Sequence, residues 1–186
     1  MKPLFYRLFS SPFGTFSIVW YETEKGPKVR RVFLPREGSK VKILVRTVFA
    51  EAKPLSCSMI QEVGKEIQRF LEGEAVRFKL HSVDLEKCSL FQRRVLLAEY
   101  AIPRGWISTY GRIAESLRIP GGARAVGSAL AHNPFPIIIP CHRAIKSDGE
   151  LGGFQGGLKM KRALLRLEGV ELTGTGKVLM RKIYYG

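Results

Sequence analysis

The sequence predicts a protein of the α/β class, more closely an α+β fold, built from two domains. Residues 4–34 are rich in aromatic and β-branched side chains and contain two turn signals, which predicts three short antiparallel strands. The apolar alternation within residues 15–20 is imperfect, so it leaves open which face is buried. Apolar residues then recur at helical spacing in residues 40–52 and 58–71.

The character of the sequence changes near residue 85, where we place the domain boundary. We expect a first domain at residues 1–84, a second, mostly helical domain at residues 85–172, and a basic tail at residues 173–186. Helical patterns at residues 91–100 and 159–167 frame the second domain.

A helix-turn-helix pattern lies between these two helices. A hydroxyl residue can cap a short helix at residues 108–117, and a Pro-Gly-Gly turn separates it from a second helix at residues 123–130. The second helix is made almost entirely of small residues and carries Arg124 in its first turn. Such a smooth helix fits a nucleic-acid groove, with one cation able to reach between bases. It equally fits close packing against a neighbouring helix with Arg124 solvated.

Cys141 is the candidate reactive residue. Residues 137–139 are three isoleucines that predict a short buried strand, and Pro140 ends it. Cys141 then lies at a strand end beside His142 and Arg143, two cationic side chains that can lower the pKa of a thiol. The alternative is a buried, inert cysteine with two incidental polar neighbours.

Two further segments flank the cysteine. The side chain of Asn133, which precedes a proline, can bond adjacent backbone groups and lock a turn. Residues 150–157 hold four glycines around Phe154. This run is either a flexible linker or a loop whose backbone passes close to a flat ligand.

The charge favours a polyanionic partner. The chain has 31 Lys and Arg residues against 16 Asp and Glu, a formal charge of +15. Nucleic acid is the first candidate, and a solvated basic surface without a specific partner is the alternative. Three widely spaced cysteines, Cys57, Cys88 and Cys141, favour neither a disulfide framework nor a zinc module, although a Cys57–Cys88 bridge stays open. Without a signal or membrane segment, we expect a soluble, intracellular protein.

The motifs of the second half form an ordered series that resembles the O6-alkylguanine-DNA alkyltransferases. The resemblance covers roughly residues 88–170 and implies a ribonuclease H-like fold for the first domain. It rests on the following motifs: Tyr110-Gly111, Ala123-Arg124-Ala125-Val126-Gly127, Asn133-Pro134, Pro140-Cys141-His142-Arg143, Gly156-Gly157 and Glu168-Gly169.

The resemblance implies a role for each polar residue of the site. Cys141 is the alkyl acceptor, and His142 takes the thiol proton through a water. Glu168 orients and charge-balances the imidazole, which moves Arg143 from thiolate stabiliser to structural residue. Tyr110 donates a proton or hydrogen bond to the departing base. Asn133 stabilises the turn between the recognition helix and the active site.

It also implies how the substrate is reached. The O6 atom lies within the stacked duplex, so the base is flipped out and Arg124 takes its place. The other expected DNA-binding residues are Thr109, Tyr110, Ala123, Ala125 and Gly127. The expected walls of the base pocket are Pro136, Leu151, Phe154, Gln155 and Gly156.

The implied activity is DNA repair by an irreversible transfer, one event per molecule, without a cofactor. The expected partner is double-stranded DNA containing O6-alkylguanine, with O4-alkylthymine left open, and we expect a cytoplasmic monomer that binds no membrane. No cysteine precedes Cys57, so we expect no zinc. Phe154 stands where the family often has tyrosine, and Gly122 where alanine is common. Competing interpretations are a lesion sensor, a helix-turn-helix regulator with a structural cysteine, and a cysteine hydrolase.

Overall fold

A computed structural model of the chain describes residues 2–185. Its contacts divide the chain into two compact units. The first comprises Met1–Leu85 and Pro134–Ile138, and the second comprises Glu86–Asn133 and Ile139–Gly186. A short piece of the predicted second domain therefore packs with the first unit, where the N–H of Val32 donates to the carbonyl of Pro134 at 2.8 Å.

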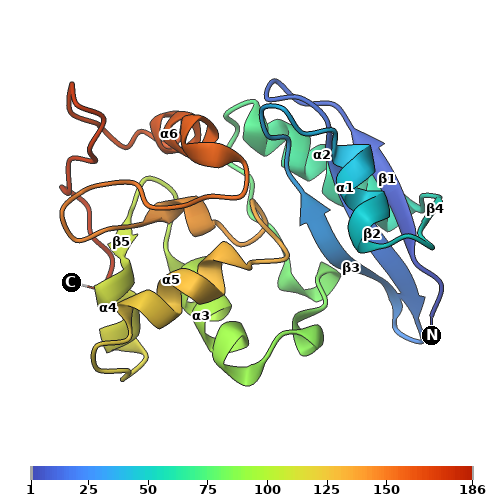
Figure 1. The fold of residues 1–186 in the computed structure, drawn as a ribbon, viewed down its shortest axis with the longest axis horizontal. Coiled ribbons are helices and arrows are strands. Elements are labelled where there is room, and N and C mark those ends of the chain that lie inside the picture. Colours follow the sequence, from blue (N-terminus) through green and yellow to red (C-terminus); the bar gives the residue numbers. More distant parts are fainter. Residues whose placement is uncertain (1, 186) are drawn as a thin grey trace. The chain divides into compact units, whose positions relative to one another are not determined.

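The first unit is built on a four-stranded mixed sheet in the order β3-β2-β1-β4 (Figure 1). The three predicted strands are confirmed as an antiparallel meander of β1 (Phe5–Phe9), β2 (Phe16–Thr23) and β3 (Gly26–Phe33). The two-residue β4 (Lys53–Pro54), which pairs in parallel with β1, was not predicted because so short a strand has no periodicity.

Two helices cover opposite faces of this sheet (Figure 1). They are α1 (Val41–Val48) and α2 (Ser58–Leu71). The cluster beneath α1 consists of Tyr6, Val19, Phe33, Val41 and Val45. On the other face, α2 approaches β1 so closely that a Cβ on Gly64 would lie 2.2 Å from the Phe9 ring. Because β2 is buried on both faces, its sequence does not alternate cleanly.

The second unit is mostly helical and contains one small parallel sheet. The helices are α3 (Leu90–Ala101), α4 (Tyr110–Ser116), α5 (Ala123–Ala131) and α6 (Gly157–Leu167). The strands are β5 (Ser108–Thr109) and β6 (Ala144–Ile145). The 3₁₀ turns of the chain are η1 (Leu80–Ser82), η2 (Leu85–Lys87) and η3 (Cys141–Arg143). Each predicted helix is present, with ends shifted by a few residues.

The basic tail packs into the second unit. The unit's apolar cluster consists of Ile107, Ile145, Leu151, Leu165, Val170 and Val178, with Leu172 and Ile183 against it. The hydroxyl of Ser108 donates to the carbonyl of Tyr184 at 2.8 Å, and the hydroxyl of Tyr185 donates to the carbonyl of Ala98 at 2.9 Å. Residues beyond 172 therefore contribute to the core around β5.

The predicted strand at residues 137–139 is wrong. Ile137 and Ile138 form a turn, with Ile137 at a φ of 75°, and all three isoleucines are at most 1% exposed. Prolines at positions 134, 136 and 140 remove backbone donors, so this segment cannot sustain a ladder. The apolar run reflects burial alone.

Two further findings concern cysteines and membranes. Cys57 and Cys88 are not joined by a disulfide, so the bridge left open above is not formed. Within residues 2–185, no helix has the length and apolar character needed to cross a membrane.

Candidate active site around Cys141

Cys141 begins η3, and its thiol is buried, with 6% of the residue exposed. We expected its cationic neighbours to lower the pKa of the thiol, and this expectation is wrong. Burial raises the pKa of Cys141 to about 12, with the charge of Glu99 adding to the rise, while Asn133 and Lys161 act in the opposite direction. At rest the thiol is protonated, so a thiolate requires a local proton acceptor.

The imidazole of His142 is held by a buried carboxylate. Its Nε2 lies 2.9 Å from Oε1 of Glu168, and both side chains are almost completely excluded from solvent. Burial lowers the pKa of His142, against the pull of Glu168, so the ring is neutral at neutral pH. We assign the proton of the neutral ring to Nε2, because Nε2 faces the carboxylate and can donate to it. Nδ1 is then the basic nitrogen. The pair can accept a proton and hold the resulting charge.

Arg143 binds the same carboxylate in a bidentate manner. Its Nε donates to Oε2 of Glu168 at 2.8 Å, its Nη2 donates to Oε1 at 2.7 Å, and its Nη1 donates to the carbonyl of Ile102 at 2.6 Å. Burial raises the pKa of Glu168, but His142 and Arg143 outweigh it and hold that pKa at about 2. The guanidinium is therefore engaged by Glu168, in line with a structural role.

Asn133 connects the end of α5 to the cysteine. Its side chain is buried, and Nδ2 donates to the carbonyl of Ile139 at 3.0 Å. The N–H of Cys141 donates to the same carbonyl at 2.8 Å. A hydrogen bond from Asn133 also lowers the pKa of the thiol. Asn133 thus holds the turn from which Cys141 projects.

Tyr110 begins α4 and lies between α5 and the glycine loop. A Cβ on Gly127 would lie 3.8 Å from its ring, and a Cβ on Gly152 would lie 2.5 Å from its hydroxyl. Burial raises the pKa of Tyr110, and the charges of Glu99 and Cys141 add to the effect. The phenol remains protonated and can donate.

The predicted pocket residues divide into three groups. Phe154 is half-buried, with its ring centroid 6.2 Å from that of His142 in an edge-to-face contact. Gln155 and Gly156 continue the loop and are also half-buried. Leu151 packs instead into the apolar cluster of the second unit, and Pro136 belongs to the first unit.

The small-residue helix α5 is buried on one face and exposed on the other. Val126, Ala129 and Leu130 are buried, whereas Arg124 and Ala125 are exposed. Ala123 and Gly127 lie half-buried at the border of the two faces. The inner face of α5 packs into the second unit. The outer face carries the cation Arg124 among small side chains.

Thr109, an expected DNA-binding residue, is buried at the N-terminus of α4. Its hydroxyl accepts the N–H of Arg112 at 3.2 Å and so caps the helix.

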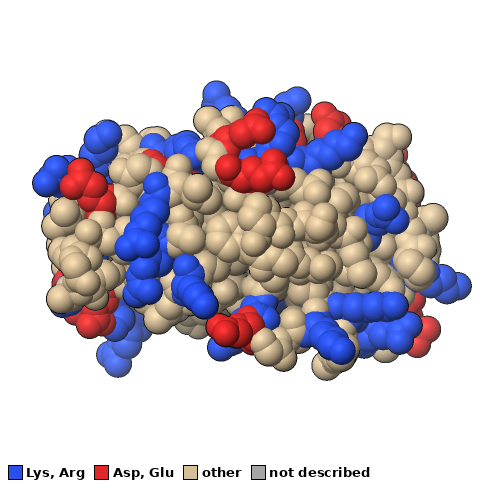
Figure 2. Space-filling model, turned by 90° about the horizontal axis from the view of Figure 1, so that it is seen from above, with Lys and Arg blue, Asp and Glu red and all other residues tan. Residues whose placement is uncertain are grey.

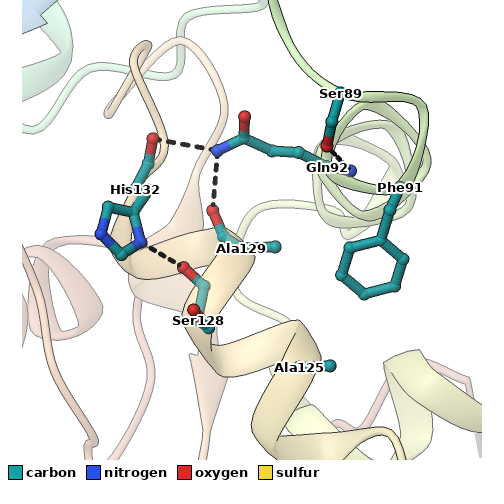
Figure 3. A pocket seen from close by; sticks show the side chains of 7 residues that line it. All are labelled: Ser89, Phe91, Gln92, Ala125, Ser128, Ala129 and His132. Atoms are coloured by element: carbon teal, nitrogen blue, oxygen red, sulfur yellow. Dashed lines mark hydrogen bonds between the residues drawn. The ribbon is translucent and has the colours of Figure 1, made fainter.

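A pocket of about 300 Å³ lies between α3 and α5, and Cys141 is not among the residues that line it (Figure 3). The amide of Gln92 spans it, donating to the carbonyls of Ala129 at 3.2 Å and His132 at 3.0 Å. The pocket is lined by Ser89, Phe91, Gln92, Ala125, Ser128, Ala129 and His132. It adjoins the exposed face of α5 and contains none of the predicted base-pocket residues.

Sequence reasoning missed two charged residues of the site, Glu99 and Lys161, which are both 0% exposed. A signal for Glu99 was present, because it continues the apolar stripe of Val95 and Leu96 at helical spacing. Lys161 likewise lies on the buried side of α6, among Met160 and Leu164.

Comparison with known proteins places this site in a family. A family model described as 6-O-methylguanine DNA methyltransferase, DNA binding domain, matches residues 90–170. A relative from Methanothermobacter thermautotrophicus, named methylated-DNA–protein-cysteine methyltransferase, is 47% identical over 115 residues, covering 62% of this chain and 64% of the relative. That alignment spans slightly less than two thirds of the relative's length. A protein of the same name from Methanosarcina acetivorans is 35% identical over 168 residues, covering 89% of this chain and 99% of the relative.

Solved structures agree. The crystal structure of Mycobacterium tuberculosis OGT in complex with DNA has a TM-score of 0.71 at 34% identity, covering 88% of this chain and 91% of that one. The O6-methylguanine-DNA methyltransferase from Pyrococcus kodakaraensis, at 24% identity and a TM-score of 0.66, shares the fold. With a full-length relative above 30% identity and a buried cysteine, histidine and glutamate at the matching motifs, the chain belongs to the methylated-DNA–protein-cysteine methyltransferase family.

Proposed function

We propose that this chain repairs DNA by transferring an alkyl group from O6 of guanine to Sγ of Cys141, once per molecule. The observation that carries the proposal is the buried Cys141 followed directly by His142, whose ring is held by Glu168 at 2.9 Å. This is the order of nucleophile, base and orienting group that nucleophilic catalysis requires.

The proposed step balances within the chain's own groups. The thiol proton of Cys141 passes to His142 through a water, and Glu168 stabilises the imidazolium. Sulfur then attacks the alkyl carbon, forming the S–C bond as the O6–C bond breaks. The departing guanine is stabilised by a hydrogen bond from Tyr110, whose phenol stays protonated in its buried position, and the base gains the proton that the thiol gave to His142. The product thioether is inert, so the protein is consumed.

The proposed partner is double-stranded DNA containing O6-alkylguanine. The exposed face of α5 would enter a groove, and Arg124 would fill the space of the flipped nucleotide. Thr109 would act through its cap on α4, and Ala123, Ala125 and Gly127 would let the duplex approach closely. A homologue solved in complex with DNA supports this partner.

The proposed base pocket is walled by Phe154, Gln155 and Gly156 of the second unit, with Leu151 supporting the loop from the core. We further infer a ribonuclease H-like fold for residues 1–84 and a DNA-binding and alkyl-transfer domain at residues 85–172. The sheet with helices on both faces supports the first inference.

The test uses a duplex that carries one O6-methylguanine with a labelled methyl group. We expect one label per wild-type molecule and none on Cys141→Ala, which should still bind the duplex because its DNA-facing helix is unchanged. Cys57→Ala and Cys88→Ala are matched controls, since each removes a thiol elsewhere in the chain that forms no disulfide, and they should transfer normally.

Each competing function gives a different result. A sensor or regulator binds the duplex and transfers nothing. A hydrolase releases the label over many turnovers. Labelling of Cys141→Ala would place the acceptor elsewhere and overturn the assignment.

A further inference from the structure

Glu99 is a buried carboxyl group for which the proposed transfer has no use. It lies on the inner face of α3 beside Val95 and Leu96 and is fully buried. Within residues 2–185, neither of its carboxylate oxygens has a hydrogen-bond partner of ordinary geometry. The N–H of Ala144 lies close enough to act on its charge, but a buried carboxyl group without a well-formed hydrogen bond is costly, so a function or a nearby positive charge is expected to explain it.

Lys161 supplies the nearby positive charge. It is fully buried on α6, where Nζ donates to the carbonyls of Ala144 at 2.6 Å and Gly153 at 3.4 Å. The same Nζ lies 5.9 Å from the centroid of the Tyr110 ring. Both α3 and α6 pack against η3, the turn that carries Cys141. Glu99 and Lys161 therefore approach the acceptor from two different helices.

The two groups titrate in the same range. Burial raises the pKa of Glu99 to about 8, against the opposing effects of Lys161, Arg143 and the N–H of Ala144. Burial lowers the pKa of Lys161 to about 8, against the opposing effects of Cys141 and Glu99. Because Glu99 and Lys161 interact, the two pKa values describe the pair and are not assigned to one residue each. As the pH rises through this range, the pair passes from a net positive to a net negative charge.

The other groups that face Glu99 do not neutralise it. They come from four parts of the second unit: Cys141 and Arg143 on η3, Tyr110 on α4, Glu168 after α6, and Tyr185 in the tail. Arg143 and Glu168 are engaged with each other, and the two phenols stay protonated. Lys161 is thus the cation that remains to balance Glu99.

We propose that Glu99 is a positioning residue for the acceptor thiol, which together with Lys161 sets the charge beside Cys141 and restrains thiolate formation in alkaline solution. This inference rests on the proposed function of Cys141. A negative charge on Glu99 opposes both a thiolate on Cys141 and a phenolate on Tyr110, whereas Lys161 favours the thiolate. The buried carboxyl therefore makes the reactivity of the acceptor rise less with pH than that of an isolated thiol.

The test measures the alkylation rate of Cys141 by iodoacetamide across the pH range, with peptide mass spectrometry to separate it from the other two cysteines. For Glu99→Gln, we expect a rate within about twofold of wild type near pH 6.5, where the carboxyl is already protonated. Above about pH 8.5 the variant should react at least about threefold faster, since one pKa unit of interaction corresponds to about tenfold. Transfer from free O6-benzylguanine should follow the same profile.

The matched control is Glu115→Gln, which removes an exposed carboxyl on α4 and should reproduce the wild-type profile. If Glu99→Gln does not fold, the second variant is Glu99→Leu, which completes the apolar stripe of α3. If the role of Glu99 is only structural, its substitution changes the melting temperature but leaves the pH profile of Cys141 alkylation as in wild type, or it changes the alkylation rate by the same factor at every pH. Either result would overturn the inference.

Failure of the inference and of the proposed function are distinguishable. Iodoacetamide reports the thiol whether or not the protein repairs DNA. A wild-type protein that transfers label from the duplex while its variants keep the wild-type pH profile refutes only the role of Glu99. A protein that transfers no label refutes the function on which that role rests.

Discussion

At the scale of single residues, Glu168 is the centre of the charge arrangement around Cys141. One carboxylate binds the imidazole of His142 and, in a bidentate manner, the guanidinium of Arg143. All three side chains are nearly excluded from water, so each depends on the others for its hydrogen bonds. Removing one partner leaves an uncompensated charge in the interior.

Glu168→Gln is therefore expected to destabilise the fold by about 3–5 kcal/mol at neutral pH, because Arg143 stays buried without its counter-charge. Urea unfolding measures this change. The control is Glu171→Gln, which breaks a solvent-exposed pair with Arg181 at 3.2 Å and should cost less than about 1 kcal/mol. Equal losses in the two variants would contradict the central role of Glu168.

The same carboxylate predicts a pH dependence. The pKa of Glu168 is about 2 in the folded protein and about 4.3 in the unfolded chain. The carboxylate therefore contributes to the free energy of unfolding fully above about pH 4.3, and this contribution is lost as the pH falls towards 2. Wild type should lose more stability than Glu168→Gln over this acidic window. Parallel stability curves would show that the ion pair carries no such linkage.

At the scale of elements, the glycine loop after Leu151 supports Tyr110. Gly152 has a φ of 66°, and a Cβ there would lie 2.5 Å from the phenol oxygen. Gly153 follows it with nothing within 4 Å of the same position. The methyl group of an alanine at position 152 would therefore clash with Tyr110, whereas at position 153 it would enter open space.

Gly152→Ala is expected to displace the hydroxyl of Tyr110 and strain the backbone, at a cost of about 1–3 kcal/mol. If Tyr110 donates to the leaving base, transfer from free O6-benzylguanine should slow at least about tenfold, as expected for a lost general acid. Gly153→Ala is the matched control and should keep the wild-type rate. Similar rates in all three proteins would exclude a role for this contact.

The small-residue helix α5 is the second feature at this scale. Val126 and Leu130 pack on the buried side of the helix. The exposed side around Ala125 carries small side chains. The turn before it has left-handed backbone at Arg118 (φ 57°) and Gly121 (φ 66°). Composition alone could not tell the two faces apart, because alanine stands on both, at the buried Ala129 and at the exposed Ala125.

At the scale of the whole molecule, the dominant property is the formal charge of +15. On the face shown in Figure 2, basic side chains outnumber acidic ones and are spread over the surface. Such a charge distribution favours DNA through counterion release.

Binding to undamaged duplex should therefore weaken at least about tenfold between roughly 50 and 200 mM salt, as fluorescence anisotropy would show. Transfer from free O6-benzylguanine should change little over the same range, because that substrate is uncharged. A salt effect of equal size on both would indicate that salt acts on the active site rather than on DNA binding.

Much of the fold was predictable because its signals are local. The strands of residues 5–33 and the helices of both units follow from side-chain periodicity, turn residues and caps such as Thr109. The order of motifs singled out Cys141, His142 and Glu168 before any contact between them was known, and the last two are joined by a hydrogen bond across 26 residues. The contact between His142 and Glu168 is the one that the resemblance implied, and the catalytic roles of these residues are predictions.

The tertiary structure alone decided how these residues behave. The isoleucines at 137–139 form a buried turn instead of a strand, and the thiol pKa of Cys141 is raised instead of lowered. Glu99 and Lys161 meet the site from α3 and α6, which are 62 positions apart in the chain at these residues. The sequence by itself determined most of the helices and strands and, through its resemblance to a family, the candidate residues for the chemistry. Burial decided their charge, because desolvation depends on what packs over a group and not on its neighbours in the chain.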